Sequence, residues 1–400
     1  MRQWRIKGMF CGLVFGLCLS SLPIRAQELT PTAVQDPTLI PTANSLALLN
    51  LYSPFDPHRL AALAEVIKKK LMIEVNLVQI DKENMAARLQ KNPLQPSPDL
   101  LLMADSGRLE RLARADLIRS FTPSKKDDQF LTPEAHLELK SAIQAIPPQW
   151  QMDKGQWVTV GKFARLVVVR EGYPRSNRVI GYLDLSRPEF AEKICQNNQL
   201  YSITYQSLLA QILMRIEREA TAKWLTEVKR NFAPLSLTEQ ASIDASLPEE
   251  ERILRQLSQN LCDIALVSSR SLGILADRTG PEDQKYFKRF KVIWPQLPPM
   301  AVADKVSNPM TAGVAMEAIG LVLPINSSHT KEAAEIALFL LSDEGQKLLA
   351  EILHSYPVKP GVEIPKSLVW LGGFTQDTTP LDRLLPRYDE AAAIAETSGD

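Results

Sequence analysis

A cluster of polar residues directly follows a short apolar run in the second half of the chain. Residues 263–267 have the composition of a buried strand, and Ser268, Ser269, Arg270 and Ser271 come next. Open α/β sheets bind ligands just past the carboxyl ends of their strands. A guanidinium can hold a carboxylate or phosphate through two parallel hydrogen bonds, and serine can donate to the same anion. The pattern favours an anion site, although a solvated or Glu-paired arginine among ordinary turn serines fits it too.

Five further candidate ligand-binding residues lie at predicted strand ends and helix starts: Tyr52, Asp56, Asp105, Ser106 and Tyr205. Each of the last four also has a purely structural explanation. Asp56 can cap a helix that begins at the proline after it. Asp105 and Ser106 can begin another helix, and Tyr205 can belong to the core at the start of an apolar helix.

Catalytic and metal-binding motifs are absent from the sequence. There is no Gly-x-Ser-x-Gly elbow, no His-Glu-x-x-His and no phosphate-binding loop. The four histidines, His58, His136, His329 and His354, do not have the spacing of metal ligands. We therefore expect a protein that is not an enzyme and carries no resident metal or cofactor.

The pattern of apolar residues predicts alternating strands and helices from residue 46 onward. Strands are expected at 46–52, 73–77, 100–103, 165–170, 263–267 and 319–323, and the main helices at 205–219, 220–231, 249–260, 332–341 and 342–353. Alternation of this kind is typical of an α/β fold, with mostly parallel sheets covered by helices on both faces.

The amino terminus has the features of a secretory signal. Basic residues precede an apolar stretch at 9–22 that is too short to cross a bilayer comfortably. A small residue, Ala26, ends the segment, so we expect cleavage after it and a periplasmic mature protein. Residues 27–45 are rich in proline and threonine and are predicted to be a disordered leader.

Charge and size restrict the class of protein further. The chain has 46 basic and 46 acidic residues, and loss of residues 1–26 removes four basic ones, which leaves 42 against 46, or −4. This balance argues against nucleic acid and anionic membrane surfaces as partners. The mature chain of about 370 residues is longer than one ordinary domain, which predicts two lobes.

Two cysteines remain once the predicted signal is removed. Cys195 and Cys262 form an even pair in an oxidising compartment, which favours a disulfide. Two buried free thiols are the alternative.

Short segments scattered over most of the chain resemble one protein family. They occur in the family's order at 49–53, 97–102, 105–109, 182–185, 193–195, 206–208, 263–273 and 356–358. The chain resembles the periplasmic ferric-iron-binding proteins, the solute-binding subunits of iron(III) ABC importers. The resemblance implies the type II periplasmic binding protein fold, in which two α/β lobes close on a hinge around a solute. It also implies a monomer that delivers its solute to an ABC permease in the inner membrane.

The resemblance suggests limits for the two lobes and a location for the site. The first lobe is expected to comprise 46–160 and 288–349, and the second 161–287 and 350–400. The site is expected in the cleft between them.

The metal ligands of the family are missing from this chain. Arg270 and Ser271 occupy the positions of the family's tyrosine pair, Asp56 that of a histidine, and Thr204 that of a third tyrosine, with Tyr205 one residue later. An arginine cannot lose its proton to become an anionic ligand, and it would repel a ferric ion. We therefore expect an anionic solute or a chelated metal rather than bare iron(III). A degenerate binding protein acting as a sensor or interaction partner, and an iron(III)-binding protein with other ligands, remain as alternatives.

Overall fold

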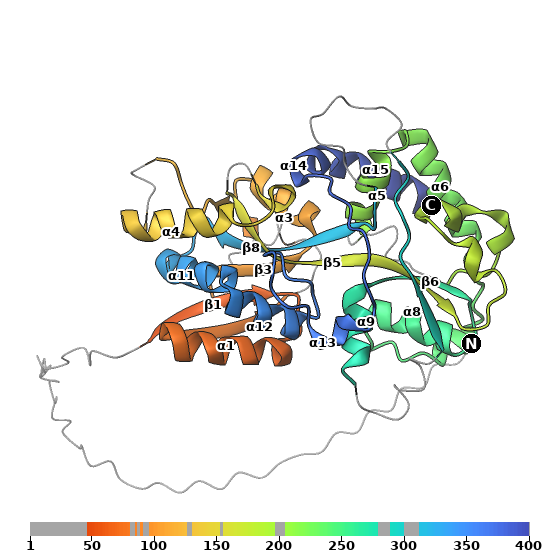
Figure 1. Cartoon of the computed structure of the whole chain (residues 1–400), viewed down its shortest axis with the longest axis horizontal. Helices are drawn as coiled ribbons and strands as arrows, with labels where there is room; N and C mark the ends of the chain where they lie inside the picture. Colours follow the sequence, from red (N-terminus) through yellow and green to blue (C-terminus); the bar gives the residue numbers. More distant parts are fainter. Residues whose placement is uncertain are drawn as a thin grey trace, which may run out of the picture. The chain divides into compact units, whose positions relative to one another are not determined.

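The structure is a computed structural model that describes residues 46–80, 85, 89–90, 96–125, 130–152, 155–196, 205–278, 289–299 and 312–399. The predicted signal peptide, the predicted leader and Thr204 lie outside these residues. Figure 1 shows the arrangement of the helices and strands.

The described residues form an 8-stranded sheet with the order β2-β1-β3-β8-β5-β6, in which β4 pairs with β8 and β7 pairs with β5. The strands are β1 (Ala47–Ser53), β2 (Ile73–Gln79), β3 (Leu100–Ala104), β4 (Ile118–Arg119), β5 (Trp157–Arg170), β6 (Ile264–Ser268), β7 (Phe290–Ile293) and β8 (Met316–Pro324). The predicted α/β class is confirmed, and most predicted strands lie within a few residues of the observed ones.

The detail of mostly parallel sheets is wrong. Among the strand pairs of the described residues, β1–β2 and β1–β3 are parallel, whereas the β3–β8, β4–β8, β5–β6, β5–β7 and β5–β8 pairs are antiparallel. The reason lies in the connections. A parallel pair needs a crossover that brings the chain back to the same end of the sheet. Helix α1 provides one between β1 and β2, whereas the connection from β5 to β6, although it contains helices, leaves these two strands antiparallel.

Strand β5 connects two parts of the sheet. Its first half, 157–164, pairs with β8, and its second half, 165–169, pairs with β6. Thirteen of its 14 residues are buried, because the strand is covered along nearly its whole length. The lobe limits stay a prediction, although β7, which falls within the predicted first lobe, pairs with the second half of β5.

Helices surround the sheet: α1 (Pro57–Leu71), α3 (Ser106–Arg114), α4 (Pro133–Gln144), α5 (Gln206–Leu213), α6 (Arg218–Arg230), α7 (Leu237–Ala241), α8 (Glu249–Ser258), α9 (Ser269–Ala276), α11 (Thr330–Leu341), α12 (Asp343–Leu353), α13 (Lys366–Val369), α14 (Leu381–Leu384) and α15 (Tyr388–Gly399). Helix α1 packs against β2 and α11 against β1, α12 packs on both of these helices, and α8 and α9 pack against β6 (Figure 1). Helix α15 packs on α5 and α6.

Three helices begin at predicted ligand-binding residues. Asp56 caps α1 by accepting from the His58 amide at 2.9 Å, and Asp105 caps α3 by accepting from the Gly107 amide at 2.9 Å. Ser268 caps α9 by accepting from the Ser271 amide at 3.2 Å. The capping alternatives left open for the two aspartates are confirmed, and each of the three residues lies where a strand is followed by a helix.

The structure pairs Cys195 with Cys262 in a disulfide, with 5.0 Å between the two Cα atoms. The bond ties Cys195, which lies before α5, to Cys262, two positions before the start of β6.

Candidate solute-binding site

A cavity of about 280 Å³ lies where the starts of α1, α3 and α9 meet strands β5 and β8 and helix α8. Its volume is close to the lower end of the range for small-molecule sites, roughly 300 Å³. The lining contains as many carboxylates as arginines: Asp56, Asp105, Glu249, Glu250, Glu251 and Glu317, with Arg59, Arg108, Arg165, Arg255, Arg270 and Arg278. Which of these charges pair with each other therefore decides what the cavity can bind.

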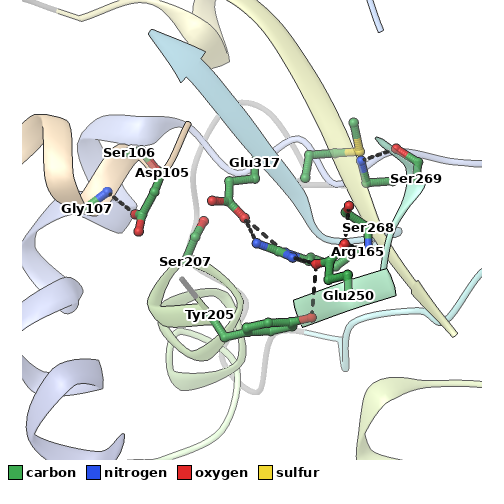
Figure 2. A network of polar contacts seen from close by, with 12 residues as sticks. Asp105, Ser106, Gly107, Arg165, Tyr205, Ser207, Glu250, Ser268, Ser269 and Glu317 are labelled. Atoms are coloured by element: carbon green, nitrogen blue, oxygen red, sulfur yellow. Dashed lines mark hydrogen bonds and ion pairs between the residues drawn. The ribbon is translucent and has the colours of Figure 1, made fainter. Parts of the chain in front are cut away.

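Arg165 is the centre of a buried ion network. Its Nε and Nη2 donate to Oε2 of Glu317 at 3.0 and 2.6 Å, and its Nη1 donates to Oε1 of Glu250 at 2.7 Å. Figure 2 shows the guanidinium between the two carboxylates. Burial alone would lower the pKa of Arg165, but the two carboxylates outweigh it and raise that pKa. The arginine is therefore a fixed cation that holds both carboxylates in place.

Glu250 accepts hydrogen bonds from Ser268 and Ser271, two of the residues that the sequence analysis predicted to bind a solute anion. Its Oε2 accepts from the amide of Ser268 at 2.9 Å and from the hydroxyls of Ser268 and Ser271. Its Oε1 accepts from the hydroxyl of Tyr205 at 3.2 Å. Burial alone would raise the pKa of Glu250, but Arg165 and the serine donors hold it below its usual range. In this structure, a carboxylate of the chain itself occupies the anion site at the start of α9.

Arg270 reaches into the cavity without a carboxylate partner among the residues that the structure describes. Its Nε donates to the carbonyl of Leu353 at 2.8 Å, and its guanidinium carbon lies 4.5 Å from the ring centroid of Phe55. The ring stacking favours a cation there. Burial lowers the pKa of Arg270 to about 10, which still leaves it charged at neutral pH. The terminal nitrogens of Arg270 have no hydrogen-bond partner among the described residues and can donate to an anion.

Two buried carboxylate oxygens on the cavity wall accept no hydrogen bond from any described residue: Asp105 Oδ2 and Glu317 Oε1. Asp105 Oδ2 lies 3.7 Å from Arg108 Nε, too far for a hydrogen bond. Burial raises the pKa of Asp105 despite the neighbouring arginines, and burial, with a contribution from Asp105, raises the pKa of Glu317 to about 7. A buried acceptor without a donor is costly, so these atoms need a proton, a water or a ligand group.

Of the predicted ligand-binding residues, five line the cavity: Asp56, Asp105, Ser268, Arg270 and Ser271. The other four are absent from its lining. Ser106 pairs with the Tyr388 hydroxyl, and Ser269 Oγ accepts from the Ala164 amide at 3.1 Å. The Tyr52 hydroxyl donates to the carbonyl of Pro96 at 2.5 Å. The remaining residue, Tyr205, is buried and bonds to Glu250 and to the carbonyl of Leu266.

Sequence reasoning missed Arg165, Glu250 and Glu317. Arg165 and Glu317 lie inside otherwise apolar strand segments. A charged residue at such a position could have indicated a buried ion pair, because ionic side chains are rarely buried unless they are paired. Glu250 lies in an acidic run at the start of α8, where acidic residues commonly complement the helix dipole. Nothing local marks it as an internal anion.

Among the described residues there is no group of three or more His, Cys, Asp or Glu side chains that could hold a metal ion. Within the same residues, no helix is long and apolar enough to cross a membrane.

The fold has many known counterparts. A ferric-binding protein from Campylobacter jejuni superposes with a TM-score of 0.71 at 20% identity, covering 88% of this chain and 99% of that one. A Trichodesmium protein, IdiA or FutA, in complex with iron and citrate ligands superposes with a TM-score of 0.69 at 22% identity, with the same two coverages. These likenesses establish the type II periplasmic binding protein fold.

Sequence comparison identifies a relative among named proteins. Iron uptake protein A1 of Synechocystis sp. is 24% identical over 327 residues, which are 82% of this chain and 80% of that protein. No protein-family profile matches the chain. The resemblance to the periplasmic ferric-iron-binding proteins that the sequence predicted is confirmed.

Proposed function

We propose that this chain is an exported solute-binding protein of an ABC importer, whose ligand is an anionic solute or a chelated metal rather than bare iron(III). The fold and the iron-related names of its relatives support the general role. Its task would be capture of a solute in the periplasm, closure of the cleft and delivery to a permease, by a monomer and without chemical conversion of the solute.

The observation that carries the choice of ligand is Arg270. Its guanidinium lies on the cavity wall at the position of one family tyrosine, and no described carboxylate forms an ion pair with it, although Glu250 is near enough to favour its charge. A ferric ion needs several anionic oxygen ligands, whereas this position supplies a cation. No tyrosine or histidine is among the described residues that line the cavity. A metal already wrapped in an anionic chelator would meet Arg270 through the chelator, and one structural neighbour carries iron together with citrate.

An iron(III)-binding protein with other ligands is the second candidate. The free oxygens of Asp105 and Glu317 favour it, because carboxylate oxygens are hard ligands. Arg165 and Arg108 lie beside the same oxygens and oppose a trivalent ion there.

The test is titration of the purified mature protein with bare iron(III) and, separately, with ferric citrate. We expect weak binding of bare iron(III) and no tyrosinate charge-transfer colour. The double variant Arg270→Tyr/Ser271→Tyr should gain iron affinity only partly, because Asp56 and Thr204 still differ from the family pattern. Arg230→Tyr, on an exposed face of α6, controls for an added phenol. Tight, coloured binding of bare iron(III) by the unmodified protein would refute the proposal.

A further inference from the structure

Most charges on the cavity wall neutralise each other. Glu251 pairs with Arg278 through two contacts and lies 3.5 Å from Arg255, while Glu249 pairs with Arg252. Arg165 neutralises Glu250 and binds one oxygen of Glu317, as described above. Arg59 contacts the ring of His354 at 2.7 Å. After these pairs, Arg270 and two carboxylate oxygens, Asp105 Oδ2 and Glu317 Oε1, keep hydrogen-bonding capacity that no described residue uses, and these two groups are of opposite kind.

The first group is the guanidinium of Arg270. Its Nε is fixed by the carbonyl of Leu353, and the rings of Phe55 and Phe163 lie 4.5 and 5.7 Å from its centre. These contacts hold the plane of the guanidinium and leave its two Nη atoms for an oxyanion. A planar guanidinium matches the spacing of two carboxylate oxygens.

The second group is the pair of acceptors, Asp105 Oδ2 and Glu317 Oε1. They come from different elements, the turn between β3 and α3 and the first residues of β8, and both side chains are about 2% exposed. Figure 2 shows Glu317 between Arg165 and the side of the site on which Asp105 lies. Because no described residue donates a hydrogen bond to either oxygen, the pair favours a group with several N–H bonds. A primary ammonium has three donors and no acceptor.

We propose that the solute is a small zwitterion, an aminocarboxylate whose oxyanion binds Arg270 and whose primary ammonium donates to Asp105 and Glu317. The inference rests on the proposed solute-binding function and narrows its anionic ligand to one that also bears a cation. A single positive charge with N–H donors suits the position better than a trivalent metal, because Arg165 and Arg108 lie beside the two carboxylates.

Calorimetric titration of the mature protein with a matched series of compounds tests the inference. The series consists of glycine, β-alanine, γ-aminobutyrate and 6-aminohexanoate, the carboxylates butyrate and hexanoate, butylamine, and glycine betaine. We expect one aminocarboxylate to bind at least about tenfold more tightly than the carboxylate or amine that lacks its second charge. Glycine betaine should bind more weakly than glycine, because its quaternary nitrogen has no N–H to donate.

Variants then assign the two ends of the solute. Asp105→Asn retains the oxygen that caps α3, and Glu317→Gln retains an acceptor for Arg165. Each should weaken the best aminocarboxylate at least about tenfold and leave the matched carboxylate unchanged or improved. Arg270→Gln should weaken both compounds. Asp116→Asn, at an exposed aspartate that also has a positive φ, and Arg230→Gln are the matched controls.

The outcomes separate the inference from the proposed function. Equal affinity for the aminocarboxylate and its matched carboxylate, or no binding by any aminocarboxylate, overturns the zwitterion. If the zwitterion is overturned but ferric citrate binds and Arg270→Gln weakens that binding, the proposal of an anionic solute is still supported. A single cooperative thermal transition, at a temperature no lower than that of the unmodified protein, confirms that a variant is folded. If one variant does not fold, the comparison of ligand affinities for the unmodified protein still tests whether the solute is a zwitterion.

Discussion

Glu250 shows how a single residue can change the meaning of a binding pattern. Serine donors at the start of a helix favour an anion, because the unpaired amides and the helix dipole point toward it. Here the anion is a side chain 18 residues before Ser268, held at the same time by Arg165. The proposed solute would therefore bind Arg270, which the same helix presents two residues further along. Within one turn, the helix would use some polar groups for structure and another for binding.

Glu317 predicts a measurable dependence of stability on pH. Burial raises its pKa in the folded state to about 7 from the ordinary 4.5, so the folded protein holds a proton that the unfolded chain releases. The stabilisation from this proton is complete below about pH 4.5 and is lost as the pH rises through about 7. Glutamine cannot ionise. Relative to the wild-type protein, Glu317→Gln should therefore gain on the order of 1–3 kcal/mol in unfolding free energy across this window.

Urea unfolding at about pH 5 and about pH 8 checks this expectation. His354, whose pKa burial lowers to about 4, titrates in the opposite sense, but it is present in both proteins and cancels in the difference. Glu351→Gln, at an exposed position of α12, should show no such trend. Parallel pH profiles for the wild-type protein and Glu317→Gln would contradict the assignment.

At the scale of elements, close packing of α3 on the sheet fixes the acceptor end of the site. Helix α3 begins at Asp105 and packs on β8, the strand that carries Glu317. Gly320 lies at the contact, where a Cβ would be 2.3 Å from Leu109 Cδ1 and 2.9 Å from Trp157 Cε3. The absence of a side chain at this position allows the helix to approach the strand.

Gly320→Ala should therefore destabilise the protein, by roughly 1–3 kcal/mol for overpacking. Gly373→Ala is the control, since a Cβ there meets nothing within 4 Å. It should change the unfolding free energy by less than about 0.5 kcal/mol. Chemical denaturation measures the unfolding free energy of both variants. Equal changes in this free energy would mean that α3 can move away from β8 without loss of stability.

The disulfide stabilises the packing of β6. Its two cysteines are separated by 67 positions, and in the chain-entropy model a closed loop of that length contributes about 4 kcal/mol. Cys195→Ser/Cys262→Ser should lose a stabilisation of this order. Thiol titration of denatured, unreduced mature protein should find no free thiol, and two reactive thiols would exclude the bond.

For the whole molecule, the cavity is where segments far apart in the chain meet. Arg270 on α9 contacts Phe55, just before α1, and Leu353, at the end of α12. Phe55 lies 215 positions before Arg270 in the sequence, and Leu353 lies 83 positions after it. A solute bound to Arg270 would therefore act directly on the contact between these segments. Arg270 would then take part both in binding the solute and in closing the cleft.

Export is the prediction that concerns the chain as a whole. The basic start, the short apolar stretch and Ala26 lead us to expect cleavage between Ala26 and Gln27. Sequencing of the mature protein from the periplasm should begin at Gln27. A membrane-bound protein that keeps its amino terminus would contradict this expectation.

Local patterns in the sequence determined most of the elements. Apolar periodicity located strands such as β6 and helices such as α11 and α12, because alternation with a period of 2 or 3.6 residues records which face is buried. Capping residues marked the starts of α1 and α3 for a similarly local reason. Arg270 was found because its position after a strand is a local property, and the family resemblance rested on the order of short segments.

Only the tertiary structure decided how the charges pair and how the strands are directed. Arg165 and Glu317 are 152 positions apart, and nothing near either residue identifies its partner. The antiparallel course of β5 and β8 depends on long connections that leave no periodic trace. An electrostatic site is defined by which charges remain after pairing. Pairing depends on distance in space, so the free Arg270 and the free oxygens of Asp105 and Glu317 could be recognised only in the folded chain.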